Sequence, residues 1–97
     1  MRFTTQMTKI LLVLRKNAEG LTERKIIEKS EGLANLERKH LASLKVSYRR
    51  NIKKLISRGL VTKEKNRYKL TGEGIDQAQK AYNDIKNRCR EYQHLVG

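Results

Sequence analysis

The sequence lacks most of the residue combinations on which enzymes and metalloproteins depend. It has one cysteine and no tryptophan, and no cysteine or histidine pairs stand at the spacing of metal ligands. A single cysteine cannot form an internal disulfide, and without such pairs zinc sites and redox motifs have no support. A glycine-rich phosphate loop, a nucleophile motif and a carboxylate pair beside a histidine are also missing. We therefore expect no catalysis, no cofactor, no metal and no small-molecule ligand.

Apolar residues are scarce as well. They make up 37% of the 97 residues, and aromatic residues only 5%. No run approaches the roughly 18 apolar residues of a membrane span, and the N-terminus has no apolar run followed by a small-residue cleavage site. This composition predicts a cytoplasmic protein of one small domain without a membrane partner. Because such a chain buries only a thin core, it also favours self-association.

Carboxylates are missing from one particular region. Residues 1–37 carry a net charge of +2, residues 38–69 carry +11 and residues 70–97 carry 0, and no acidic residue occurs in the 26 residues of 38–63. Solvated helices usually mix signs, because Glu and Lys four positions apart stabilise each other. The region therefore indicates a partner that supplies the anions. Nucleic acid, anionic lipid and acidic protein all stay possible on charge alone.

Apolar periodicity and capping residues predict the first two helices. A helix over about 6–17 follows Thr4 or Thr5 as N-cap, and Leu12 and Val13 widen its apolar face. A short extended residue at 21 and an N-cap at Thr22 then precede a second helix over 23–30, which ends by residue 32. Residues 33–44 are compatible with a helical connector or with a continuation of the second helix.

A third helix and a hairpin follow. The spacing predicts a basic helix over about 45–58, with Ser43 or Ser47 as N-cap and a left-handed glycine, Gly59, after its end. Its predicted apolar stripe consists of Tyr48, Ile52, Leu55 and Ile56. We interpret Tyr48 as a core residue rather than a base-stacking one. Residues 60–62 and 67–70 are predicted as strands joined by a tight turn at 65–66.

The last segment has apolar residues at alternating spacings of three and four. They are Ile75, Ala78, Tyr82, Ile85, Cys89, Tyr92 and Val96. Such a seam is typical of a coiled coil, and it predicts a dimerisation helix over 72–96. The alternative is that this helix packs on its own domain. Cys89 is by default a free thiol, and an intersubunit disulfide is a second hypothesis.

The order of these elements resembles a winged helix-turn-helix. Residues 52–61 are similar to the end of the recognition helix in MarR-like and PadR-like regulators, and residues 68–74 are similar to the end of their wing. Small archaeal chromatin and archaeal-virus winged-helix dimers are comparable in length. The resemblance implies a mainly α fold with a small β-hairpin wing, in which residues 1–71 bind DNA and residues 72–97 form a long C-terminal dimerisation helix.

The resemblance also implies roles for individual residues. At least one of Ser47, Arg49 and Arg50 would contact bases in the major groove. Phosphate contacts would come from Lys45, Lys53, Lys54 and Arg58. The wing residues Lys63, Lys65, Asn66 and Arg67 would touch the backbone or the minor groove. We therefore expect a homodimeric, sequence-specific transcriptional regulator of double-stranded DNA. A non-specific architectural or chromatin protein and an RNA-binding winged helix are the alternatives.

Overall fold

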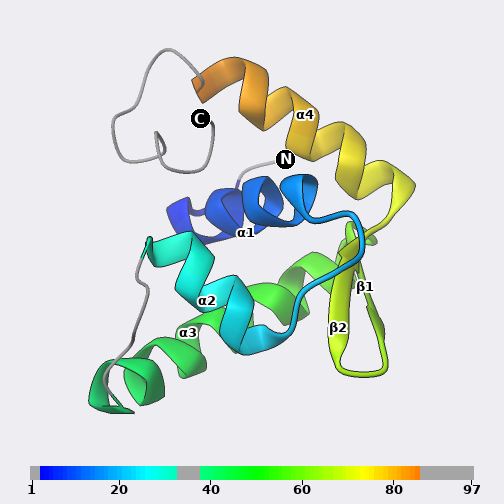
Figure 1. Cartoon of the computed structure of the whole chain (residues 1–97). Helices are drawn as coiled ribbons and strands as arrows, with labels where there is room; N and C mark the ends of the chain where they lie inside the picture. The colour runs from blue at the N-terminus through cyan, green and yellow to red at the C-terminus, as the bar shows by residue number, and fades with distance from the viewer. Residues whose placement is uncertain (1–2, 33–37, 86–97) are drawn as a thin grey trace.

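A computed structural model describes residues 3–32 and 38–85 of the chain (Figure 1). This part of the chain is mainly helical, with four helices and one small antiparallel hairpin, in agreement with the predicted mainly α fold with a small β-hairpin. In chain order the elements are α1 (Thr5–Lys16), α2 (Glu23–Glu31), α3 (Arg38–Ser57), β1 (Val61–Glu64), β2 (Arg67–Leu70) and α4 (Gly72–Ile85).

Helix α1 forms the centre of the core. Thr4 caps it by accepting a hydrogen bond from the backbone N–H of Met7 at 3.1 Å, as the sequence predicted. Five consecutive residues, Ile10 to Leu14, are buried, which confirms the wide apolar face. Figure 1 shows the reason, because α4 covers one side of α1 while α2 and α3 lie on the other.

The segment before α2 is tied to the hairpin. The backbone N–H of Leu21 donates to the Tyr68 carbonyl at 3.0 Å, and the N–H of Tyr68 donates back to the Leu21 carbonyl at 2.8 Å. Leu21 is therefore the predicted extended residue. Thr22 caps α2, as predicted, and Gly32 ends it in the left-handed conformation with φ 71°.

Helix α3 begins earlier than the sequence predicted. It starts at Arg38, so Ser43 and Ser47 lie inside the helix and neither is its N-cap. Residues 38–45 include no glycine or proline that would end a helix, and most of them are good helix formers. The hydroxyl of Ser47 instead donates to the Leu44 carbonyl one turn earlier, at 3.3 Å, which is the usual arrangement of a serine within a helix.

The buried face of α3 is narrower than predicted. Tyr48, Ile52 and Leu55 are buried against α1 and α2, but Ile56 is 39% exposed. Ile56 is therefore not part of the buried stripe, because it lies at the edge of the helix where no other element covers it fully. Gly59 follows α3 with φ 76°, as predicted, and turns the chain into β1.

The hairpin has the predicted turn and second strand, but its first strand covers residues 61–64 instead of the predicted 60–62. Val61 pairs with Leu70, and Glu64 pairs with Arg67 next to the two-residue turn. Lys65 in this turn takes a positive φ of 54°, as tight hairpin turns require. The strands are short. Half of their eight residues are exposed, and Val61 alone is buried.

Helix α4 packs on α1 over its described length. Ala78 is fully buried, and Tyr82 and Ile85 pack against the core, so these three residues of the predicted seam contact their own chain. Ile75, by contrast, is 57% exposed. Cys89, Tyr92 and Val96 lie outside the described residues. None of the helices within 3–32 and 38–85 is long and apolar enough to cross a membrane.

Candidate nucleic-acid interface

One side of α3 is directed away from the core and is strongly basic. We call it the outer face, and its residues recur at helical spacing: Ala42, Val46, Arg49, Arg50 and Lys53. All of them are exposed. Together with Lys45 they line a shallow depression that follows the helix. The buried stripe that includes Leu55 lies on the opposite side, because successive residues of an α-helix are rotated by about 100°.

Most cations of this region have no acidic partner. Within the described ranges, no carboxylate lies within ion-pair distance of Lys45, Arg50, Lys53 or Lys54. Arg49 differs, because its Nε lies 2.8 Å from Oε1 of Glu23 in the first turn of α2. The outer face therefore presents positive charge that the chain itself neutralises at one position.

The hairpin continues this basic region. A second depression lies between α3, the start of α2 and the hairpin. Lys45, Lys63 and Asn66 border it, and so does one acidic residue, Glu23. The side chain of Lys63 is held over the Tyr68 ring, with Nζ 5.7 Å from the ring centroid. The structure thus brings predicted residues of the third helix and of the hairpin to one continuous surface, which we call the basic surface.

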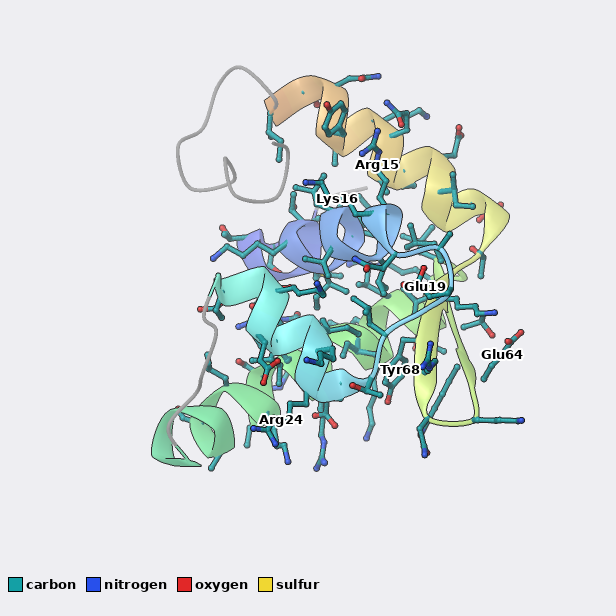
Figure 2. The ribbon with its side chains drawn as sticks, viewed as in Figure 1. Arg15, Lys16, Glu19, Arg24, Glu64 and Tyr68 are labelled. Carbon is teal, nitrogen blue, oxygen red and sulfur yellow. The ribbon has the colours of Figure 1, made fainter. Side chains whose placement is uncertain are left out.

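The acidic residue of the hairpin is directed away from this surface. Figure 2 shows Glu64 on the side of the hairpin away from α2. Its carboxylate pairs with Nζ of Lys69 at 3.1 Å. The turn residues Lys65, Asn66 and Arg67 are exposed. Glu64, although it lies in the basic part of the sequence, does not neutralise the depression that Lys63 borders.

Sequence reasoning missed several residues that border the two depressions, among them Ala42 and Glu23 as well as Arg24 and Val46. Arg24 borders the second depression, and Figure 2 shows it at the start of α2 beside α3. Its charge is shared with Glu28, whose Oε1 lies 3.1 Å from the Arg24 Nε. Val46 lines the first depression. No pattern in the local sequence indicates that α2 packs beside α3, so the position of Arg24 could not be predicted. The exposure of Val46 could have been predicted, because this apolar residue does not fall on the predicted apolar stripe of the helix.

Five of the predicted contact residues border neither depression: Ser47, Lys54, Arg58, Lys65 and Arg67. Lys65 and Arg67 line another hollow together with Glu19 and Glu64.

Ser47 does not share the outer face with Arg49 and Arg50, because it is half-buried and accepts a hydrogen bond from Nε2 of Gln6 at 3.0 Å. Arg58 lies beyond the end of α3 with its guanidinium 5.7 Å from the centroid of the Phe3 ring. Ser47 therefore needs a rearrangement to reach a ligand, whereas Arg58 is exposed at the end of the same basic region.

Tyr48 is a core residue, as interpreted from the sequence. It is fully buried, and its hydroxyl donates a hydrogen bond to Oε2 of Glu31 in α2. Burial raises the pKa of Tyr48, and the hydrogen bond to Glu31 and the negative charge of this carboxylate raise it further. Tyr48 therefore holds α2 against α3 and is not available for stacking.

The described residues contain no group of histidine, cysteine and acidic side chains that could hold a metal ion. Comparisons of the chain with protein-family models, with curated proteins and with solved structures gave no match.

Proposed function

We propose that this chain is a winged helix-turn-helix protein that binds double-stranded DNA sequence-specifically, as a homodimer, and regulates transcription. The element order supports this proposal, because α2 and α3 are followed by a hairpin and a final helix. The bridge between Leu21 and Tyr68 adds to it, since it attaches the hairpin beside the start of α2 as a third, very short strand would. In this proposal α3 is the recognition helix and the hairpin is the wing.

The observation that carries the proposal is the continuity of basic side chains from α3 to the hairpin. Lys45 and Lys63 border one depression although they lie on different elements. A major groove is about 12 Å wide and admits one α-helix, and cations beside the helix then meet the phosphates of both strands. Arg49 and Arg50 suit guanine O6 and N7, while the lysines suit phosphate.

Dimerisation through residues 72–96 is part of the proposal. Ile75 supports it, since this seam residue is 57% exposed at the start of α4. Ala78 is fully buried within its own chain, so it contributes to a dimer only by supporting the helix. A two-fold dimer would place two recognition helices in successive major grooves, about one helical turn apart.

The experiment is a titration of the full chain with a labelled duplex DNA and with the duplex RNA of the same sequence, over a range of salt concentrations. Neutralisation of roughly 6 to 10 phosphates by the dimer predicts a slope of log affinity against log salt of about −5 to −9 for DNA. Tighter binding to RNA would favour the RNA-binding alternative. Failure to bind either duplex would contradict the proposal.

A matched variant controls for non-specific charge. Lys53→Ala removes one cation from the outer face and should make the salt slope shallower by about one unit per contact. Lys80→Ala removes one exposed cation from α4, on the other side of α1, and should leave the slope unchanged. Equal effects of the two variants would indicate that net charge alone determines binding.

A further inference from the structure

The middle of the outer face is apolar rather than charged. Val46 is 62% exposed, the largest exposure among the large hydrophobic side chains in the described ranges. Ala42 lies one turn before it, and both line the depression that Arg49, Arg50 and Lys53 also border. A narrow apolar strip thus runs along the helix with cations beside it.

Folding does not account for a valine at this position. Val46 is about 180° around the helix from the buried Leu55, so it contributes nothing to the core. A β-branched residue has a lower helix propensity than the lysine, glutamate or alanine that solvated helices usually carry. The position thus combines an exposed apolar surface with a poor helix former, where a polar residue would suit the helix better.

We propose that Val46 contacts the 5-methyl group of a thymine in the major groove and selects an A·T pair at that position. The inference rests on the proposed function. The major-groove edges of the bases present hydrogen-bond donors and acceptors together with one apolar group, the thymine methyl, which apolar side chains contact. The neighbouring cations can pair with the phosphates on either side of such a contact. An apolar protein partner would instead bury these cations without a counter-charge, which costs free energy.

The experiment compares two duplexes that differ only in this methyl group. One is an alternating dA–dT duplex about two helical turns long, and the other is the same duplex with deoxyuridine in place of every thymidine. Binding of the wild-type chain is compared with that of Val46→Ala and Val46→Thr. Threonine keeps the β-branched shape and one methyl group at the same position, so it is the matched variant.

We expect the wild-type chain to bind the thymine duplex more tightly than the uracil duplex by about threefold to fivefold for each Val46 that contacts a thymine, as the burial of one methyl group predicts, and by about tenfold to twenty-fivefold when both recognition helices of a dimer make the contact. Val46→Ala, whose side chain is shorter and covers less of the methyl group, should reduce this ratio, and Val46→Thr should keep most of it. The ratio within each variant cancels any effect of the substitution on overall affinity, and the comparison of this ratio between variants cancels any effect of uracil on the stiffness of the duplex.

Two results would overturn the inference while duplex binding stands. One is equal affinity of the wild-type chain for the two duplexes, which would show that Val46 does not contact the thymine methyl group. The other is a preference for thymine that Val46→Ala leaves unchanged, which would assign it to another residue. Failure of the wild-type chain to bind either duplex would be different, because it would contradict the proposed function as well.

Discussion

Arg49 in α3 and Glu23 in the first turn of α2 form an ion pair, with the Arg49 Nε 2.8 Å from the Glu23 Oε1. The glutamate side chain is 19% exposed and the arginine side chain 61% exposed, so the acid is the more buried partner. The pair holds a predicted base-contacting arginine at the edge of the outer face. It also places one negative charge beside the path of an approaching phosphate.

Glu23→Gln should therefore raise affinity for DNA of unrelated sequence. Removing this carboxylate leaves Arg49 free to contact any phosphate and removes one repulsive charge. We expect non-specific duplex DNA to be bound about twofold to fivefold more tightly, in line with the energy of one exposed ion pair, while discrimination between sequences falls. Titrations with a random-sequence duplex measure the first effect. Glu73→Gln, an equal charge change at an exposed position of α4, should have a smaller effect, and an equal gain in both variants would contradict a local role for Glu23.

Tyr48 makes stability sensitive to alkaline pH. Its pKa is raised in the folded state, chiefly by burial, whereas the unfolded chain has the ordinary value of about 10. The unfolded state therefore loses its proton first, so this contribution to stability is present below about pH 10 and is lost as the pH rises further. The loss should be about 1.4 kcal/mol per pH unit.

The comparison for this prediction is Tyr48→Phe. This variant should be about 1 kcal/mol less stable at neutral pH, because the hydrogen bond to Glu31 is lost. Above about pH 10 its free energy of unfolding should fall less steeply than that of the wild-type chain. Urea denaturation at several pH values measures both slopes, and parallel curves above pH 10 would show that Tyr48 does not titrate on unfolding.

Two glycines at the start of α4 should respond very differently to alanine. A Cβ at Gly74 would lie 1.9 Å from the Leu60 carbonyl oxygen, so Gly74→Ala must displace α4 from the chain that leads into β1. We expect a loss of about 2 to 4 kcal/mol in unfolding free energy. A Cβ at Gly72 would meet no atom within 4 Å, and Gly72→Ala should change stability by less than about 0.5 kcal/mol. Similar melting temperatures for the two variants would contradict the close packing at Gly74.

Ile75→Lys tests the proposed dimer without damage to the core. The residue is 57% exposed, so the substitution should change the unfolding free energy by less than about 0.5 kcal/mol. If Ile75 belongs to the seam, sedimentation equilibrium should show a dimer for the wild-type chain and a monomer for the variant. A wild-type monomer would contradict the homodimer, and a dimeric variant would contradict the position of the seam.

The sequence predicted the parts of the fold that depend on local signals. Thr4 and Thr22 cap helices because their hydroxyls reach backbone N–H groups three residues ahead. Gly59 takes the left-handed conformation that other residues avoid, and the alternation around the turn at 65–66 indicated the hairpin. Each of these features depends on residues that are only a few positions apart, so it can be predicted from the local sequence.

The sequence did not predict contacts between distant segments. The ion pair of Glu23 with Arg49 and the hydrogen bond of Gln6 with Ser47 join residues 26 and 41 positions apart. The charge pattern indicated a basic region and led to the same predicted role for Ser47 and Arg49. Their exposures differ because α1 lies beside Ser47 and the start of α2 lies beside Arg49. The early start of α3 was missed for another reason, since residues 38–44 have good helix propensity but no clear apolar stripe.

The central claim is most directly tested by selecting bound duplexes from a random DNA pool at about physiological salt, with the wild-type chain and with Arg50→Ala in parallel. The account predicts enrichment of a two-fold symmetric site by the wild-type chain. If Arg50 reads a base, the variant should lose about 1 to 3 kcal/mol of affinity and relax its preference at one position of each half-site. Retention of DNA without enrichment would contradict sequence-specific regulation and favour the architectural alternative. Failure to retain duplex DNA would contradict the claim altogether.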